Sequence, residues 1–273
     1  MEKYLKEKIL NEFNYLKQNI DYNQEYEAKK IPNNKLNRYA NIRPYLNTLV
    51  HIYSENNYIN ASWIHIPEKY EFIATQGPLD TTIDDFWEMC YQYNTNIVIM
   101  LCQLKENDKI KCVNYWDKNN IKKFIFNQIN EEIEINGIII RNFELKKSIN
   151  QNFPKNIIQL HYTCWKDHMA PEENSYRRLI ELIEFIDMYK GNSPVVTHCS
   201  AGVGRTGTFI ALYNLYHDII KQINDDGITE IKFSIMNVVR KLKEMRSHLV
   251  ENEDQYLFLY QFVYLLLKEK NLV

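Results

Sequence analysis

The sequence predicts an α/β fold: a single domain in which a central twisted mixed β-sheet is flanked by helices on both sides. Residues 97–101 form an unbroken apolar run, as expected of a strand that is covered on both faces. Asn136-Gly137 lies in a β-rich region and indicates a hairpin turn. Residues 175–190 have the periodicity of an amphipathic helix. Strands and helices mixed in this way predict a layered α/β architecture.

The N-terminal half is expected to begin with a helical segment and continue into short strands. Residues 1 to about 30 are polar, with apolar side chains at helical spacing: Leu5, Ile9, Phe13 and Leu16. The elements predicted after this segment are strands at 58–62 and 71–74, a helix at 82–92 and the buried strand at 97–101. Asp84 and Asp85 in the first turn of that helix suit the positive end of its dipole.

The C-terminal half is expected to complete the sheet and to supply most of the helices. The predicted elements are β-rich segments at 121–126, 131–145 and 157–163, a strand at 195–197, and helices at 175–190, 206–223, 233–246 and 252–268. Gly191 is placed to end the first of these helices. Asn252 and Gln255 have the spacing of a capping box at the start of the last one.

The composition is that of a globular chain and excludes several classes of protein. A length of 273 residues is enough for one domain spanning residues 1–273, with 1–30 as an N-terminal helical segment. Hydrophobic residues make up 45% and charged residues 25%, so the chain is neither fibrous nor disordered. A net charge of −2 argues against a nucleic-acid partner, and no apolar run is long enough to span a bilayer.

The cysteines and the N-terminus predict a cytoplasmic protein. The five cysteines are scattered and form no C-x-x-C pair, which argues against a disulfide framework or a zinc site. The N-terminus lacks the apolar core of a secretion signal. We expect a monomer. Heavy use of Ile, Asn, Lys and Tyr, whose codons are AT-rich, favours a viral or parasite genome, and the location would then be the host-cell cytoplasm.

Residues 195–213 allow two interpretations. Residues 202–207 fit the dinucleotide fingerprint G-x-G-x-x-G, after an apolar run and before a helical one. That interpretation also needs an acidic residue at the end of the next strand. Asp225 and Asp226 lie near the required distance, but they follow a helix directly and precede a turn glycine. The dinucleotide interpretation also leaves Cys199 and Arg205 without a role.

The second interpretation makes Cys199 a nucleophile. Backbone N–H groups and the dipole of the following helix favour an anion at this position, so the thiolate form is stabilised. Gly202 and Gly204 let the loop curl into a nest of N–H groups that can hold a phosphate. Arg205 adds a planar fork for two phosphate oxygens. The neighbours also gain roles: Thr206 can donate its hydroxyl to the sulfur, and His198 can hold the cysteine backbone.

The stretch HCSAGVGRTG, residues 198–207, resembles the signature of protein tyrosine phosphatases. The resemblance covers roughly residues 30 to 268 and includes YINASWI (58–64) and TQGPL (75–79), which are expected to be structural. It implies hydrolysis of phosphotyrosine in proteins through a phosphocysteine, with no metal and no cofactor. The phosphate would be held by Arg205 and by the loop residues Ser200, Ala201, Gly202, Val203 and Gly204.

The resemblance also implies the rest of the site. Tyr39, in Asn37-Arg38-Tyr39, would stack on the substrate ring and make the pocket deep. Lys111, in KCVNYW (111–116), would contact the general-acid loop, and Glu106 would pair with Arg205. The general-acid loop itself would be WKDHMAP (165–171). Its expected members are Asp167 as general acid, Trp165 as hinge anchor and His168 as a substrate contact. Gln255, in VENEDQY (250–256), would position the attacking water.

Three residues depart from the family pattern. Lys166 replaces a proline next to Asp167, which loosens the loop and favours the ionised carboxylate. We therefore expect a shift in the limb of the pH profile that the acid sets, and lower turnover. Glu251 replaces a glutamine that positions water, and its charge should slow hydrolysis of the anionic phosphocysteine. Asn41 replaces an aspartate that binds the substrate backbone, so peptide affinity should be weaker.

These departures keep an alternative open, a slow or inactive module that binds or traps phosphotyrosine proteins. A pure binder has no need of the acid, so the presence of Cys199, Arg205 and Asp167 together favours the enzyme.

Overall fold

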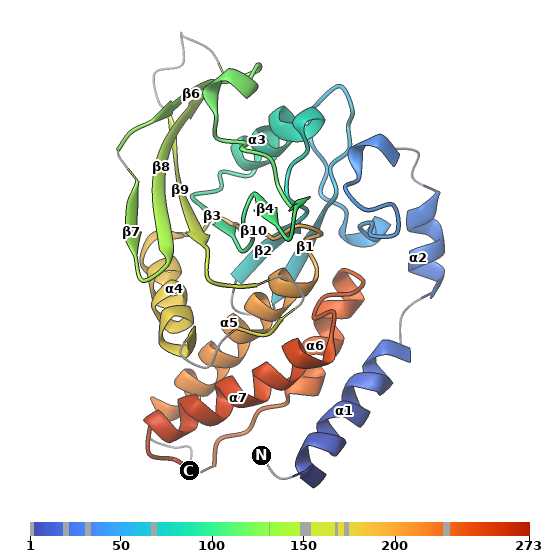
Figure 1. The fold of residues 1–273 in the computed structure, drawn as a ribbon, viewed down its shortest axis with the longest axis vertical. Coiled ribbons are helices and arrows are strands. Elements are labelled where there is room, and N and C mark those ends of the chain that lie inside the picture. The colour runs from blue at the N-terminus through green and yellow to red at the C-terminus, as the bar shows by residue number, and fades with distance from the viewer. Residues whose placement is uncertain are drawn as a thin grey trace.

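An eight-stranded mixed sheet forms the centre of the computed structural model (Figure 1). The structure describes residues 3–18, 22–30, 34–66, 70–130, 132–147, 154–166, 169–171, 175–225 and 230–273. The α-helices are α1 (Lys3–Gln18), α2 (Tyr22–Lys29), α3 (Ile83–Gln92), α4 (Tyr176–Tyr189), α5 (Gly204–Ile223), α6 (Ile235–Met245) and α7 (Glu253–Glu269). Short 3₁₀ helices occupy Asn34–Leu36, Leu46–Thr48, Asp80–Thr82 and Lys118–Asn120.

The strands are β1 (Ala61–Ile66), β2 (Tyr70–Thr75), β3 (Ile97–Met100), β4 (Lys105–Glu106), β5 (Lys109–Ile110), β6 (Ile125–Gln128), β7 (Ile133–Ile135), β8 (Ile138–Lys146), β9 (Lys155–Tyr162) and β10 (Val195–His198). The sheet order is β1-β2-β10-β3-β9-β8-β6, and β7 pairs with β8. Strands β2, β10, β3 and β9 are parallel, whereas β1, β8, β6 and β7 join antiparallel. The predicted mixed sheet is therefore confirmed.

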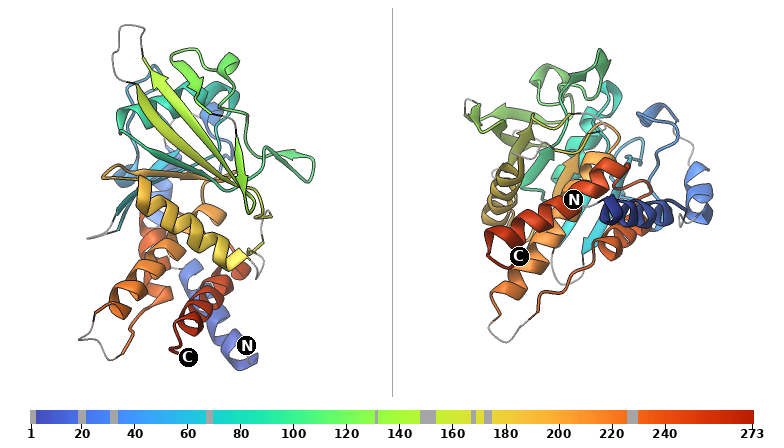
Figure 2. Two further views of the ribbon diagram at one scale, coloured as in Figure 1. Left: turned by 90° about the vertical axis from the view of Figure 1, so that its left-hand side faces the viewer. Right: turned by 60° about the horizontal axis from the view of Figure 1, so that its bottom comes forward.

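Helices cover both faces of the sheet. On β2, Phe72 and Thr75 are three residues apart and so point to opposite faces. Thr75 pairs with His198 on β10. The ring of Tyr213 on α5 lies 5.0 Å from Phe72, and the ring of Phe86 on α3 lies 5.9 Å from His198. Helix α3 therefore packs on one face and α5 on the other. Figure 2 (left) shows α4 to α7, coloured yellow to red, below the sheet.

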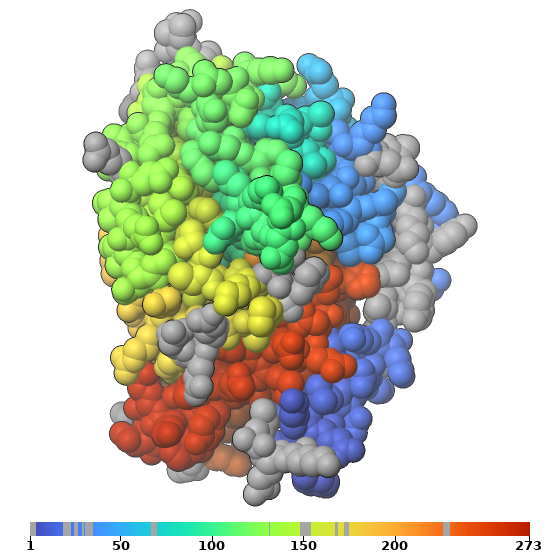
Figure 3. Space-filling model, in the orientation of Figure 1, coloured from blue at the N-terminus to red at the C-terminus, as the bar shows by residue number. Residues whose placement is uncertain are grey.

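The N-terminal segment packs against the C-terminal helices. The ring of Phe13 on α1 stacks on Tyr256 of α7 at 5.2 Å, and Glu12 accepts hydrogen bonds from the hydroxyls of Tyr256 and Tyr260 at 2.9 and 2.5 Å. Figure 3 shows the blue N-terminal segment beside the red C-terminal one. Of the predicted apolar stripe, Ile9, Phe13 and Leu16 are buried, whereas Leu5 is exposed. Residues 1–30 contain two helices, since α1 ends at Gln18 and α2 begins at Tyr22.

Local turn chemistry sets several element boundaries as predicted. Asn136 and Gly137 have φ of 53° and 79° and form the turn between β7 and β8. Gly191 has φ of 58° and follows the last turn of α4. At the start of α7 the capping box is only half formed. The Asn252 side chain accepts the N–H of Gln255 at 2.9 Å, but Gln255 Oε1 accepts the N–H of Glu251 instead.

Several boundaries differ from the prediction. The β-rich segment expected at 121–126 is a strand only from Ile125, and β6 continues to Gln128; the helix expected at 233–246 runs from Ile235 to Met245. The strand expected at 58–62 runs from Ala61 to Ile66, because Tyr58 turns out of the sheet and donates its hydroxyl to Asn37. The helix expected from Thr206 begins at Gly204, since the N–H of Gly207 already donates to the Val203 carbonyl at 2.8 Å. Within the described residues, no helix is both long and apolar enough to cross a membrane.

Candidate active site

Strand β10 and helix α5 place Cys199 at the bottom of a pocket. The strand ends at His198 and the helix begins at Gly204, so residues 199–203 form a tight loop between them. Cys199 is 4% exposed and lies ahead of the N-terminus of α5. The helix dipole and the N–H groups of its first turn favour negative charge there. The predicted strand–loop–helix setting of Cys199 is therefore present.

Two glycines allow the loop to fold this tightly. Gly202 has φ of 71°, and a Cβ on it would lie 2.1 Å from the Thr75 carbonyl oxygen. A Cβ on Gly204 would lie 2.8 Å from Glu251 Oε2 and 2.9 Å from Gln255 Nε2. Any larger residue at either position would collide with the backbone of β2 or with these two side chains.

Arg205 is held from two sides. Its Nη1 donates to Glu106 Oε1 at 2.7 Å and to the Trp165 carbonyl at 2.9 Å, and Nη2 donates to Glu106 Oε2 at 3.2 Å. Burial alone would lower the pKa of Arg205, but the charges of Cys199 and Glu106 outweigh it and raise that pKa. The guanidinium is therefore always charged, and its plane is fixed beside the cysteine. The expected pairing of Glu106 with Arg205 is observed.

The pocket has a volume of about 220 Å³ and gathers side chains from distant segments. Its lining residues are Tyr39, Asn41, Ile42, Lys109, Lys111, Cys199, Ser200, Ala201, Gly204, Arg205, Glu251 and Gln255. Ser200 Oγ donates to the Lys111 carbonyl at 2.9 Å, so the Tyr39 hydroxyl, 2.9 Å away, donates to Ser200. These two hydrogen bonds fix the Tyr39 ring at one side of the pocket. Most of the predicted contact residues therefore meet in one cavity.

Gly202 and Val203 do not line this pocket, unlike the other predicted loop residues. The Gly202 carbonyl is turned away to accept a bond from Arg246, and the Val203 carbonyl accepts the N–H groups of Gly207 and Val250. Both residues shape the loop from behind. Asp167 and His168 lie outside the described residues, so their expected positions stay predictions.

His198 holds the cysteine backbone, as expected. Its Nδ1 lies 3.0 Å from the Cys199 carbonyl, and its Nε2 lies 2.8 Å from the hydroxyl of Tyr115. Burial lowers the pKa of His198 to about 3, so the ring is neutral at physiological pH. A neutral ring that donates from Nδ1 to the carbonyl must accept at Nε2, which the Tyr115 hydroxyl satisfies. The histidine is thus locked in one tautomer.

Thr206 differs from its expected contact. Its hydroxyl is fully buried and has no hydrogen-bond partner among the described residues, so the predicted bond to the Cys199 sulfur is not formed. Trp165 begins the loop at 165–171, and its expected role as hinge anchor of a general-acid loop stays a prediction. It is 2% exposed, its indole N–H donates to the Met169 carbonyl at 2.9 Å, and its own carbonyl accepts from Arg205. The first residue of that loop is therefore hydrogen-bonded to Arg205, close to the loop at 199–203 that contains Cys199.

Sequence reasoning missed Arg246, which supports the loop from below. Its fully buried guanidinium donates to the carbonyls of Gly202 and Ala201 at 2.9 and 3.1 Å, to Asn60 Oδ1 at 2.7 Å and to Ser62 Oγ at 3.1 Å. Burial lowers the pKa of Arg246 to about 10, so it stays charged at neutral pH. Its spacing of four residues from the buried Leu242 could have indicated an arginine on an inward face.

Comparison with known proteins finds a family whose sequences are similar to this chain. The sequence model described as Protein-tyrosine phosphatase matches residues 33–265. Human tyrosine-protein phosphatase non-receptor type 20 is 36% identical over 248 residues, covering 88% of this chain and 56% of that protein. Human tyrosine-protein phosphatase non-receptor type 13 is 35% identical over 240 residues, covering 85% of this chain and 9% of that protein. The chain therefore spans only part of the length of these relatives.

A solved structure shows the same fold. Its description is "Structural basis of PTPN18 fingerprint on distinct HER2 tyrosine phosphorylation sites", and it matches with a TM-score of 0.83 at 27% identity, covering 94% of each chain. The likeness therefore extends over almost all of the structure, beyond the segments that contain the motifs.

Proposed function

Since the chain belongs to the protein-tyrosine phosphatase family, we propose that it hydrolyses phosphotyrosine in proteins through a phosphocysteine intermediate. One observation carries the proposal. Cys199 lies at the bottom of a narrow pocket, beside an arginine whose orientation is fixed by Glu106 and the Trp165 carbonyl. Such an arrangement holds a phosphate dianion in line with a sulfur nucleophile.

Substrate binding follows from the walls of the pocket. A phosphotyrosyl ring would lie against Tyr39, with its phosphate among the N–H groups of the loop and the guanidinium of Arg205. Asn41, exposed at the pocket mouth, would accept an N–H of the substrate backbone without the help of a charge. Lys111 would contact the general-acid loop, and His168 within that loop would contact the substrate. Phosphotyrosine-containing proteins are thus the proposed partners.

The chemistry would proceed in two displacements. The Cys199 sulfur attacks phosphorus, an S–P bond forms and the ester P–O bond breaks, while Asp167 gives its proton to the leaving phenol oxygen. A water molecule then attacks phosphorus, Asp167 takes the proton, and the S–P bond breaks to release phosphate and the thiolate. Gln255 and Glu251, both at the pocket wall, would position that water. The loop N–H groups and Arg205 stabilise the charge of both transition states.

The alternative of a pure phosphotyrosine-binding module is not favoured, because Cys199, Arg205 and the Glu106 support are all in place. For the location we propose the cytoplasm. All five cysteines are unpaired thiols in the structure, which suits a reducing compartment. The viral or parasite origin and the monomeric state stay predictions from the sequence.

The experiment that tests the proposal is phosphate release from a phosphotyrosyl peptide, with and without EDTA. We expect turnover that EDTA leaves unchanged. Cys199→Ser should abolish turnover while the peptide still binds. The matched control is Cys164→Ser, which removes a partly exposed thiol outside the pocket and should leave turnover intact. Retained turnover in Cys199→Ser would refute the proposed nucleophile, and peptide binding without any turnover in the wild type would favour the trapping module.

A further inference from the structure

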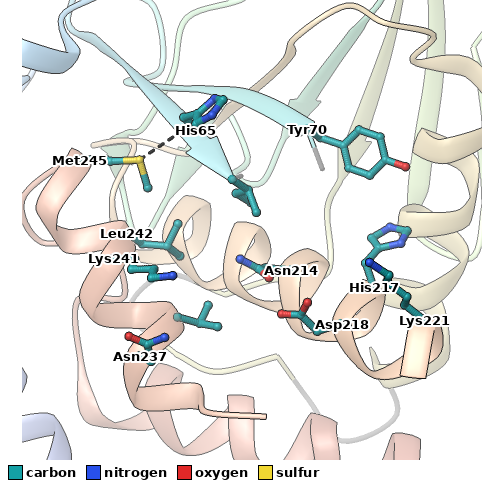
Figure 4. A pocket seen from close by; sticks show the side chains of 12 residues that line it. His65, Tyr70, Asn214, His217, Asp218, Lys221, Asn237, Lys241, Leu242 and Met245 are labelled. Carbon is teal, nitrogen blue, oxygen red and sulfur yellow. Dashed lines mark hydrogen bonds between the residues drawn. The ribbon is translucent and has the colours of Figure 1, made fainter. Parts of the chain in front are cut away.

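A second pocket lies at the other end of α5 from Cys199. It has a volume of about 550 Å³, within the range of small-molecule sites, and is larger than the catalytic pocket. Helices α5 and α6 form its sides, and the adjoining ends of β1 and β2 close it (Figure 4). Its lining residues are His65, Ile66, Tyr70, Asn214, His217, Asp218, Lys221, Asn237, Val238, Lys241, Leu242 and Met245.

One part of this pocket is polar and positively charged. Lys221 on α5 and Lys241 on α6 approach it from opposite sides (Figure 4). Neither ammonium group forms an ion pair or a hydrogen bond within the described part of the chain. Among the described lining residues, Asp218 supplies the one carboxylate, against the ammonium groups of Lys221 and Lys241. The described lining therefore carries more positive than negative charge.

The two histidines of the lining already have acidic partners outside it. His217 Nε2 lies 3.0 Å from Asp187 Oδ2, and His65 Nδ1 lies 3.3 Å from Glu71 Oε1. Burial would raise the pKa of Asp187, but its bonds from His217, Lys190 and Tyr213 lower it to about 2. Asp187 is therefore ionised and occupied by its own partners, and it does not neutralise Lys221 or Lys241.

The other part of the pocket is apolar. Ile66, Val238 and Leu242 line this part, and their side chains are packed into the core with exposed fractions of 5%, 8% and 1%. Met245 continues this wall, and its sulfur accepts the backbone N–H of His65 at 3.2 Å (Figure 4). If only an inorganic anion bound here, these apolar side chains would stay in contact with water. A ligand with an apolar body and one anionic group would satisfy both parts.

The pocket is separate from the catalytic one. Gly204 starts α5 at the phosphate loop, and His217 comes thirteen residues later. At 1.5 Å per residue, the two positions are about 20 Å apart along the helix axis. A phosphotyrosyl side chain bound at Cys199 cannot extend into the second pocket. Its occupant is therefore a different molecule from the substrate.

We propose that this second pocket is a binding site for a small organic anion, with the anionic group between Lys221 and Lys241 and the apolar body against Leu242 and Met245. The anionic group would be a phosphate, sulfonate or carboxylate, since each can accept bonds from two ammonium groups. Tyr70 and His217, whose rings are 5.6 Å apart, lie at the α5 side of the pocket and can contact a planar body.

The test uses ¹³C-methyl methionine and NMR. The chain has 7 methionines, and two of them report on the two sites. Met245 lines the second pocket, whereas Met169 lies in the general-acid loop (165–171), where its carbonyl accepts the indole N–H of Trp165. Their signals are assigned with Met245→Leu and Met169→Leu. The probe is 8-anilinonaphthalene-1-sulfonate, which carries an aromatic body and a sulfonate that the enzyme cannot hydrolyse.

We expect the Met245 methyl signal to shift saturably on addition of the probe. In Lys221→Ser/Lys241→Ser the affinity read from Met245 should fall by about tenfold or more, since two charge-assisted contacts are lost. The matched control Lys118→Ser/Lys122→Ser removes the same charge from exposed positions outside the lining and should leave the affinity unchanged. Lys221→Arg/Lys241→Arg should preserve binding, which separates the charge from the lysine side chain itself.

Two further comparisons make the outcome decisive. N-phenyl-1-naphthylamine has the same aromatic body without the sulfonate and should bind at least about tenfold more weakly. The proposal would be overturned if the neutral probe bound as tightly as the sulfonate, or if the double serine variant bound the sulfonate as tightly as the wild type. Either result would show that only apolar contacts bind the probe. A Met245 signal that does not move, or that moves only together with Met169, would also overturn it.

Discussion

Glu251 and Gln255 both approach Gly204 at the start of α5. Glu251 is charged and Gln255 is neutral, and we expect the charge to affect the rate of hydrolysis. Both side chains reach the point where a Cβ of Gly204 would be, and the N–H of Glu251 donates to Gln255 Oε1 at 2.9 Å. The proposed phosphocysteine intermediate is anionic, so a carboxylate at this point should hinder the water that attacks it in the second displacement. The second displacement should therefore limit the rate.

We predict that Glu251→Gln speeds hydrolysis of the phosphocysteine by several-fold. Rapid-quench kinetics with an aryl phosphate should show a burst followed by a slow steady state in the wild type. In the variant the burst should shrink and kcat should rise. Glu253→Gln, a neighbouring exposed acid, is the control and should behave like the wild type. A linear trace from the wild-type enzyme would contradict this account of Glu251.

Site residues that lie in one contiguous motif could be predicted from the sequence. Residues that support the site from distant parts of the chain could not. The HCSAGVGRTG stretch predicted Cys199, Arg205 and the bond from His198 to the cysteine carbonyl. Arg246 lies 44 positions from Gly202, and its role depends on the meeting of three chain segments, at 60–62, 201–202 and 246. Thr206 shows the opposite error, because side-chain orientation at the start of α5 cannot be derived from adjacency.

The loop at 165–171, proposed to supply the general acid, contains a cation next to Asp167 in the sequence. Lys166 is exposed and directly precedes Asp167 in the chain. A cation next to a carboxylate favours its ionised form, which cannot act as an acid. Replacing the lysine should therefore extend the pH range over which Asp167 is protonated towards higher pH.

We predict that Lys166→Pro moves the alkaline limb of the kcat–pH profile to higher pH and raises kcat, because the ring also restricts the loop. Lys166→Gln separates the two effects: it should move the limb without raising kcat to the same extent. If neither variant moves the profile, Lys166 does not act on the acid.

Helix α1 precedes residues 33–265, the part matched by the family model, yet it packs into the core. Phe13 is fully buried and stacks on Tyr256 of α7. Phe13→Ala should lower the free energy of unfolding by about 3–5 kcal/mol, as expected for loss of a buried ring. Asn14→Ala, at an exposed position of the same helix, should change it by less than about 0.5 kcal/mol. Urea denaturation of both variants gives the comparison, and equal values would contradict the packing of α1.

At the element scale, most helices and strands were predictable because their periodicity is local. The run at 97–101, the Asn136-Gly137 turn and the Gly191 stop all lie where local chemistry places them. The ends of β1 were not predictable, since pairing of Ile66 with Tyr70 and the bond from Tyr58 to Asn37 decide where the strand runs. Strand order was also beyond local patterns, because β10 enters between β2 and β3 from far along the chain.

Two buried histidines, His161 and His198, should make the free energy of unfolding depend on pH. Burial lowers the pKa of His198 to about 3 and that of His161 to about 4. Both are neutral in the folded state, whereas in the unfolded chain they become protonated below about pH 6.5. Their contribution to stability is complete above that pH. It falls by about 1.4 kcal/mol per histidine and pH unit as the pH drops towards the folded values.

Urea denaturation between pH 7 and 4.5 should therefore show a steeper loss of stability in the wild type than in His161→Gln. The comparison isolates one histidine from the carboxylates that also titrate in this range. His65→Gln, an exposed histidine, is the control and should keep the wild-type slope. Identical slopes in His161→Gln and the wild type would show that His161 is not held neutral.

The fold brings the ends of parallel strands and a helix N-terminus together around Cys199. We propose that the Cys199 sulfur becomes phosphorylated during turnover. The most direct measurement is acid quenching of the wild-type enzyme with a phosphotyrosyl peptide, followed by peptide mass spectrometry. We expect one phosphoryl group on the peptide that contains Cys199, and none in Cys199→Ser. Continued phosphate release with no phosphoryl group on Cys199, or with the group on another residue, would contradict it.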